Sequence, residues 1–157
     1  MHIRARFAML VVGALALPAM AIGGTSGNRG KLGDTLTVKG QTKDVIAVTA
    51  IKVQDPATGY SPAAGKRVVG IFFRVKNVGK VKYKDFPSAL LTTRDGQSSG
   101  SAISTGGSCN SPSTITLRPG QKKSFCLPFQ VPKRSRLKTV QYQTDGGYGT
   151  PAVFKLG

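Results

Sequence analysis

The sequence predicts an all-β protein, a β-sandwich of about eight short strands that follows an N-terminal signal peptide. Apolar and polar residues alternate with a period of two in several stretches, which places one face of each strand in a core. Gly 20 and Pro 9 supply frequent turn signals, and no long run of helix-forming residues at helical spacing follows residue 21. Unequal strand lengths favour a sandwich over a small barrel.

The N-terminus has the pattern of a secretory signal. Arg4 and Arg6 precede an apolar run at residues 7–17, and a small-x-small sequence ends at Ala21, after which we expect cleavage. An uncleaved membrane anchor is the alternative, but the apolar run is shorter than the roughly 20 residues of a spanning helix. We therefore expect no stable membrane span after cleavage. No cysteine stands directly after the apolar run, so the sequence gives no basis for a lipid anchor.

Three regions are predicted along the chain: a signal peptide at 1–21, a flexible leader at 22–33 that is rich in glycine and polar residues, and a folded domain at 34–157. The domain begins with strands expected at 34–39 and 45–53. A loop rich in turn residues follows at 55–66. It is long for a hairpin, so we expect it at the surface.

The clearest strand of the first half is Val68–Asn77. Its odd-numbered positions from Val69 to Val75 are apolar and form the expected core face. The even-numbered positions face the other way, and among them Phe72 is expected to pack under a loop. Further strands are expected at 80–85 and 89–93, and the Gly/Ser-rich segment 96–113 is predicted to be a surface loop with a weak strand at 102–105.

The strongest strand signal of the second half lies within 117–132. Phe125, Leu127, Phe129 and Val131 alternate with polar positions and give it an apolar face. Pro128 has no backbone N–H, so this strand is expected at a sheet edge or a bulge. Short strands are expected before it at 115–117 and after it at 137–143 and 152–156.

Two cysteines, Cys109 and Cys126, are the only ones in the chain. Export to an oxidising compartment favours a disulfide between them. It would close a loop of about 16 residues and stabilise the fold by about 3 kcal/mol. A zinc site would need four ligands and a reactive thiol would need a base, yet the chain has no glutamate and its one histidine is His2, within the signal peptide.

The charge balance is strongly basic, with 23 Lys+Arg against 6 acidic residues, all of them Asp. Removal of the signal peptide takes away Arg4 and Arg6 and leaves a net charge of +15. Such an excess favours anionic partners, and the alternative is a basic surface that serves only solubility. The candidate residues for an anionic partner are Lys80, Lys82, Lys84, Lys122, Lys123, Lys133, Arg134 and Arg136. Lysines 80, 82 and 84 would share one face of a strand, where they also fit an edge protected from aggregation.

Enzymatic chemistry has little support in the sequence. Without a histidine after the signal peptide, Ser-His-Asp and Cys-His arrangements are excluded. We predict no enzyme, no cofactor and no metal site, with a Ser-Lys or Asp-pair hydrolase as the less favoured alternative. A nucleic-acid or other polyanion binder is the stronger rival, for which the candidate stacking residues are Tyr60, Tyr83, Tyr142 and Tyr148.

Several short motifs occur in a characteristic order. V-x-N-x-G at 75–79 is followed by a tyrosine-containing strand, D-G at 95–96, L-x-P-G at 117–120 and F-x-V-P at 129–132. This order resembles the bacterial secreted telokin-like domains of unknown function, which are grouped with the immunoprotective extracellular immunoglobulin-like antigens of actinobacteria. The resemblance spans roughly residues 31–157 and implies an exported immunoglobulin-like sandwich, often lipid-anchored, with no established enzymatic activity.

The sequence as a whole predicts a secreted, basic immunoglobulin-like module of the cell envelope, with a binding or structural role and no catalysis. The expected location is extracellular or periplasmic. Its expected partner is an anionic cell-wall polymer, an acidic lipid or another envelope protein.

Overall fold

The computed structural model of this protein describes residues 28–59 and 61–157. The expected signal peptide, with its cleavage position after Ala21, lies outside these residues. The described part contains eleven strands and one short 3-10 turn. They are β1 (Arg29–Lys31), β2 (Thr35–Lys39), β3 (Val45–Gln54), β4 (Lys66–Asn77), β5 (Tyr83–Asp85), β6 (Ser88–Thr93), β7 (Ser98–Gly100), β8 (Ile115–Leu117), β9 (Lys122–Pro132), β10 (Leu137–Gln143), η1 (Asp145–Gly147) and β11 (Ala152–Lys155).

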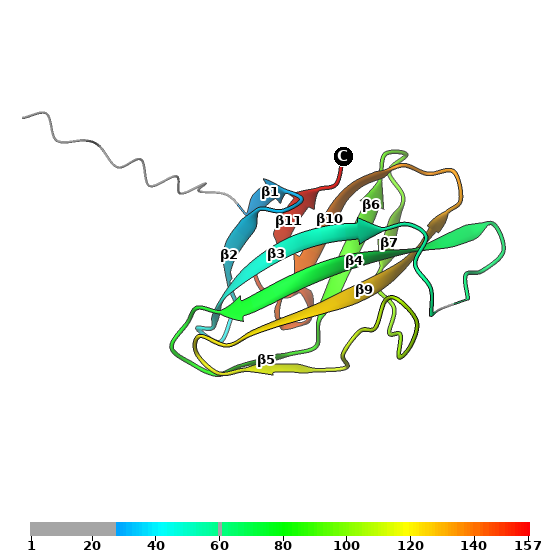
Figure 1. Cartoon of the computed structure of the whole chain (residues 1–157). Helices are drawn as coiled ribbons and strands as arrows, with labels where there is room; N and C mark the ends of the chain where they lie inside the picture. The colour runs from blue at the N-terminus through cyan, green and yellow to red at the C-terminus, as the bar shows by residue number, and fades with distance from the viewer. Residues whose placement is uncertain (1–27, 60) are drawn as a thin grey trace, which may run out of the picture.

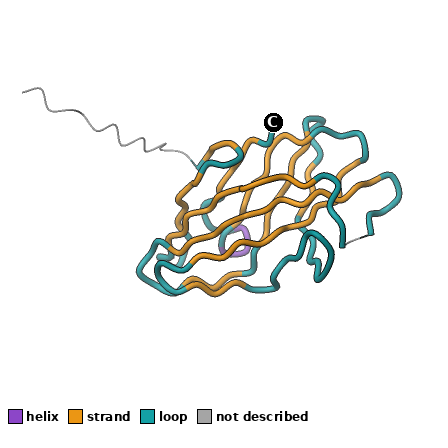
Figure 2. Tube along the Cα trace, viewed as in Figure 1, coloured by secondary structure: helices purple, strands orange, loops and turns teal. Residues whose placement is uncertain are grey.

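The strands form two facing sheets, which confirms the predicted all-β sandwich. A five-stranded sheet has the order β1-β11-β10-β6-β7, and a four-stranded sheet has the order β2-β3-β4-β9. The four-stranded sheet crosses in front of the five-stranded sheet in Figure 1, and strands joined by loops make up nearly all of the trace in Figure 2. A small pair, β5 and β8, lies beside β9.

The core lies between the two sheets and is built from the inward face of each strand. On β4 the predicted odd-numbered set is buried, with Val69, Ile71, Phe73 and Val75 all at 0% exposure. The ring of Phe73 lies 5.3 Å from that of Tyr142 on β10, measured between centroids. Alternation with a period of two therefore identified this face of the sheet correctly.

Strand β9 lies at the edge of its sheet, as Pro128 predicts. Neighbouring residues of an edge strand point their N–H groups alternately toward the partner strand and away from it. The N–H of Cys126 points away from β4 and donates to the carbonyl of Asn110. Pro128 occupies the equivalent outward position, where a missing N–H removes no bond to β4.

Three local expectations need correction. The expected leader, 22–33, overlaps β1, which pairs in parallel with β11. Main-chain hydrogen bonds make this pairing, so the side-chain pattern of this glycine-rich segment gives no signal of a strand. The expected strand at 80–85 is shortened to Tyr83–Asp85. The weak strand expected at 102–105 is absent from the described chain, where Ser98–Gly100 pairs with β6 instead.

The described residues include no helix long and apolar enough to span a bilayer.

Candidate anion-binding face

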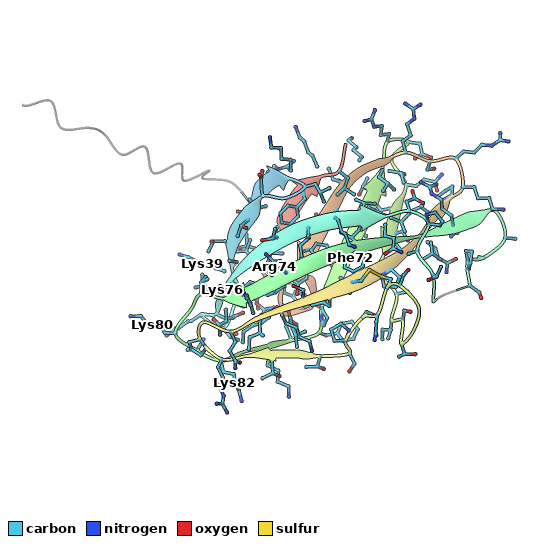
Figure 3. All side chains as sticks on the ribbon, in the orientation of Figure 1. Lys39, Phe72, Arg74, Lys76, Lys80 and Lys82 are labelled. Atoms are coloured by element: carbon cyan, nitrogen blue, oxygen red, sulfur yellow. A yellow bond between two sulfur atoms is a disulfide. The ribbon has the colours of Figure 1, made fainter. Side chains whose placement is uncertain are left out.

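The outward side of the four-stranded sheet carries a group of exposed cations. Arg74 and Lys76 project from β4, and Lys122 lies directly opposite Lys76 on β9. Lys39 ends β2, and Lys52 lies on β3 beside Phe72. Figure 3 shows Lys39, Arg74 and Lys76 on the same side of the sheet. We call this set of five exposed side chains the cationic face: Lys39, Lys52, Arg74, Lys76 and Lys122.

The fold places these cations outward because their neighbours in sequence are core residues. Phe73 and Val75 point inward, so Arg74 and Lys76 must point outward. The register then sets Lys76 against Lys122. Like charges directly opposite each other on paired strands destabilise a sheet. The fold therefore brings like charges close together although their repulsion lowers the stability of the sheet.

The aspartates of the described chain form no ion pair with these five cations. One ion pair is found within residues 28–59 and 61–157, between Arg67 and Asp55 at 2.9 Å. The other carboxylates accept hydrogen bonds from backbone N–H groups or hydroxyls in turns. Asp34 accepts from the Lys31 N–H, and Asp95 accepts from the Ser135 hydroxyl. Within the described chain, the cationic face is therefore not neutralised by any ion pair with a carboxylate.

Two more lysines extend the cationic face at one end of the sheet. Lys80 and Lys82 lie in the turn that follows β4, which the side chain of Asn77 holds in place. Asn77 is fully buried; its Nδ2 donates to the carbonyls of Val81 at 2.8 Å and Leu117 at 2.9 Å. The turn is thus tied both to β4 and to β8, which fixes its position at the end of the sheet.

The disulfide-bonded loop covers the other half of the same outward face. The structure confirms the bond between Cys109 and Cys126, with an S–S distance of 2.05 Å. Both cysteines pack with Phe72, as expected for a side chain under a loop. Gly70 lies directly beneath, since an added Cβ would come 2.8 Å from the Cys126 Sγ. The outward face of this sheet is therefore half covered and half open.

Lys52 marks the boundary between the two halves. Its Nζ lies 4.3 Å from the centre of the Phe72 ring, and Lys52 is exposed to solvent. A cation over an aromatic ring is held by the ring's negative face and remains available to solvent. The Phe72 ring therefore lies at the edge of the cationic face, next to the disulfide.

The eight cations predicted from sequence do not form one patch. Lys80, Lys82, Lys84, Lys122 and Lys123 lie near the start of β9, whereas Lys133, Arg134 and Arg136 follow its end. An eleven-residue strand separates the two groups by about 33 Å. Lysines 80, 82 and 84 do not share a strand face either, because residues 78–82 form a turn.

Four members of the cationic face were missed by sequence reasoning: Lys39, Lys52, Arg74 and Lys76. For Arg74 and Lys76 a signal existed, because the alternation of β4 puts them opposite the core face. No sequence signal could place Lys39 and Lys122 beside them, because pairing of strands far apart in the chain sets that arrangement.

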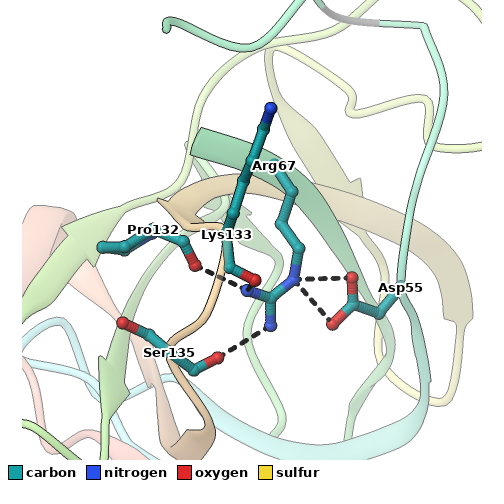
Figure 4. Close-up of polar contacts among 5 residues, drawn as sticks. All are labelled: Asp55, Arg67, Pro132, Lys133 and Ser135. Atoms are coloured by element: carbon teal, nitrogen blue, oxygen red, sulfur yellow. Dashed lines mark hydrogen bonds and ion pairs between the residues drawn. The ribbon is translucent and has the colours of Figure 1, made fainter. Parts of the chain in front are cut away.

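At the far end of β4, Arg67 is engaged in structure. Its Nε donates to both carboxylate oxygens of Asp55, at 2.9 and 3.0 Å. Its two terminal nitrogens donate to the carbonyls of Pro132, Lys133 and Ser135 (Figure 4). These bonds fix the turn that displays Lys133, Arg134 and Arg136.

That far end also holds acidic groups among its cations. A shallow hollow of about 340 Å³ is lined by Arg94, Arg134 and Arg136 together with Asp95. The hydroxyls of Thr93 and Ser135 hydrogen-bond to the Asp95 carboxylate and lower its pKa, so this group stays charged near neutral pH. Positive charge at this end is partly offset by Asp55 and Asp95.

Two of the four tyrosines considered for base stacking lie in the core and not on the cationic face. Tyr83 and Tyr142 are buried in the core, where burial raises the pKa of both hydroxyls. Tyr148 is 81% exposed, on the turn after η1. Tyr60 lies outside the described residues. Within those residues no group of three or more His, Cys, Asp or Glu side chains is placed to hold a metal ion.

Comparison with known proteins places the chain by its fold. No family model matches it, and no curated protein matches it in sequence. Among solved structures, it is similar to MPT63, a secreted protein from Mycobacterium tuberculosis, with a TM-score of 0.61 and 18% identity over 81% of this chain and 95% of that one. The yjhA protein from Bacillus subtilis matches with a TM-score of 0.58 and 17% identity over 82% of this chain and 99% of that one.

A putative lipoprotein from Bacillus subtilis, ycdA, matches with a TM-score of 0.51 and 16% identity, over 76% of this chain and 38% of that one. At identities this low, these structural matches show a shared β-sandwich fold and nothing more specific.

Proposed function

We propose that this protein is a secreted, non-enzymatic binding module of the cell envelope whose cationic face recognises an anionic polymer or surface. One observation carries the proposal: five exposed cations share an open sheet face, and none of them forms an ion pair within the described chain. Arrays of one charge attract counter-charged partners and accelerate their association.

The geometry of the cationic face suits an extended anionic partner. Successive outward residues of one strand, such as Arg74 and Lys76, stand about 7 Å apart, and directly opposed residues on neighbouring strands stand about 5 Å apart. The lysines of the 78–82 turn continue the array past the end of the sheet. Repeated charges along a wall polymer, or head groups packed in an acidic membrane, have comparable spacings.

Export is supported by two independent features. The N-terminal sequence has the arrangement of a signal peptide, and the domain contains a disulfide, which persists in oxidising compartments. MPT63 is described as secreted and ycdA as a putative lipoprotein, which agrees with an envelope location. The motif order from 75 to 132 further supports membership of the telokin-like group.

Binding at two ionic strengths tests the proposal. The secreted protein is mixed with a poly(glycerol phosphate) polymer, and separately with vesicles that contain an acidic phospholipid, at about 50 mM and about 500 mM salt. We expect binding at low salt and its loss at high salt. Absence of binding at low salt, or binding that salt leaves unchanged, would contradict the electrostatic mechanism.

Single-stranded DNA belongs in the same panel because it is also a polyanion. Sequence-tolerant DNA binders add aromatic stacking to charge, and Tyr83 and Tyr142 are buried here. We therefore expect DNA to bind no more tightly than the wall polymer at equal charge concentration. Preferential binding of DNA would favour the nucleic-acid alternative.

A further inference from the structure

Three of the six aspartates gather at one corner of the sandwich, where turns from both sheets meet. Asp44 ends the turn between β2 and β3, Asp145 begins η1, and Asp85 ends β5. The N–H of Asp145 donates to Oδ2 of Asp85 at 2.9 Å, and the N–H of Gln41 donates to Oδ2 of Asp145 at 2.5 Å. In a chain with so few acidic residues, this concentration calls for a physical explanation.

Asp44 is the member that hydrogen bonding does not satisfy. The residue is 3% exposed, so its carboxylate is almost entirely out of solvent. Oδ1 accepts a hydrogen bond from the Thr42 hydroxyl at 2.6 Å, but Oδ2 has no partner among the described residues. A buried carboxylate oxygen without a donor or a counter-ion is strongly unfavourable.

The Asp44 and Asp145 carboxylates converge on the same point. A Cβ added to Gly40 would lie 2.5 Å from both oxygens of Asp44 and 2.6 Å from Oδ2 of Asp145. Glycine is therefore required at position 40, and three carboxylate oxygens from two turns lie close together beside its Cα. Two carboxylates this close repel each other unless a cation or a proton lies between them.

We propose that Asp44 and Asp145 bind a divalent cation of the calcium class. Hard oxygen ligands of this kind suit Ca²⁺, which also accepts hydroxyl, carbonyl and water oxygens at variable geometry. The Thr42 hydroxyl already contacts Asp44, and waters would complete the shell. With two carboxylates, the expected affinity is that of extracellular calcium modules, about 10⁻⁴ to 10⁻³ M.

The site would join the two sheets. The β2–β3 turn belongs to the four-stranded sheet, and η1 follows β10 of the five-stranded sheet. The Gln41 side chain already donates to the Tyr148 carbonyl at 3.0 Å, so the two turns are in contact. A cation held by Asp44 and Asp145 would replace their mutual repulsion with a bridge.

Thermal unfolding of the full chain from a secreting host tests the proposal. After treatment with EDTA, the protein is melted at pH 7.5 with and without about 5 mM CaCl₂. A site of the expected affinity should raise the melting temperature by about 3 to 9 °C. Asp44→Asn and Asp145→Asn should each abolish the increase. Asp95→Asn, an exposed turn aspartate at the other end, is the matched control and should keep it.

Tb³⁺ gives a direct reading that does not depend on the variants. Tyr148 is exposed on the turn of Asp145, so bound Tb³⁺ should luminesce on tyrosine excitation and be displaced by Ca²⁺. No calcium-dependent shift in the wild type, or an equal shift in Asp44→Asn, would overturn the proposal.

Discussion

The two ends of strand β4 use arginine in opposite ways. Arg67, near the start of the strand, donates to Asp55 and to three backbone carbonyls. Arg74, seven residues on, is exposed, and its side chain has no hydrogen bond or ion pair with the described residues. Both are charged residues of the same strand. One holds the fold together, and the other is free to meet a partner.

The difference shows that positive charge in a sequence is not the same as available positive charge. Near Arg67, the carboxylates of Asp55 and Asp95 lie among the cations and offset them. Near Arg74, a second strand places Lys122 against Lys76 and so adds to the charge. A function that depends on free cations should therefore map to the Arg74 end.

The largest expected effect concerns the disulfide-bonded loop between these two ends. Replacing both Cys109 and Cys126 with Ala should lower the free energy of unfolding by about 3 kcal/mol, because the unfolded chain gains freedom. Urea denaturation measures the change. Binding of the folded variant to the wall polymer should stay unchanged, since neither cysteine belongs to the cationic face. A parallel loss of affinity would show that the covered half contributes to binding.

The next effect separates the two arginines by stability. Arg67→Gln should lower the free energy of unfolding, measured by urea denaturation, by about 2 kcal/mol. The substitution leaves the Asp55 carboxylate and three carbonyls without their charged donor. Arg74→Gln should stay within about 0.5 kcal/mol of the wild type. Equal losses of unfolding free energy at the two positions would contradict the view that Arg67 is structural and Arg74 is free.

Some of the features that this comparison depends on could be predicted from the sequence. Alternation along β4 identifies Phe73 as core and Arg74 as outward, and export makes the Cys109–Cys126 bond expected. Pro128 likewise indicates an edge strand. These inferences depend on local pattern and compartment, which the sequence carries directly.

The remaining features depend on contacts between distant segments. Opposition of Lys76 and Lys122 requires the register of β4 and β9, and the engagement of Arg67 requires the turn after β9. Strand β1 is held by main-chain pairing with β11, which its side chains do not encode. For the same reason, the sequence could not show that Asp44 and Asp145 converge at Gly40.

A smaller effect probes the like-charge pair itself. Lys76→Glu should raise the free energy of unfolding by about 0.5 kcal/mol, because it turns repulsion with Lys122 into attraction. The same variant should bind the polymer more weakly. Stability that rises while affinity falls is typical of a functional site. Calorimetry and polymer binding on one preparation would reveal it, and a fall in stability would contradict the assigned register.

The smallest effect lies at the Arg67 end and concerns Asp95. Hydroxyl hydrogen bonds hold its pKa below the ordinary value of 3.8, so its contribution to stability is present above that value and is lost as pH falls through the lowered pKa. Ser135→Ala should move the pKa back toward 3.8, as NMR titration of the carboxyl carbon would show. An unchanged pKa would mean that the Ser135 hydroxyl does not stabilise the charged form.

Two triple variants of equal charge test the central claim most directly. One carries Arg74→Gln, Lys76→Gln and Lys122→Gln; the other carries Lys133→Gln, Arg134→Gln and Arg136→Gln, whose side chains are exposed at the far end of β9. Affinity for poly(glycerol phosphate) is measured at about 50 mM salt. We expect the first variant to lose at least about tenfold in affinity and the second less than about threefold. Equal losses would show that net charge alone drives binding and would contradict a dedicated cationic face.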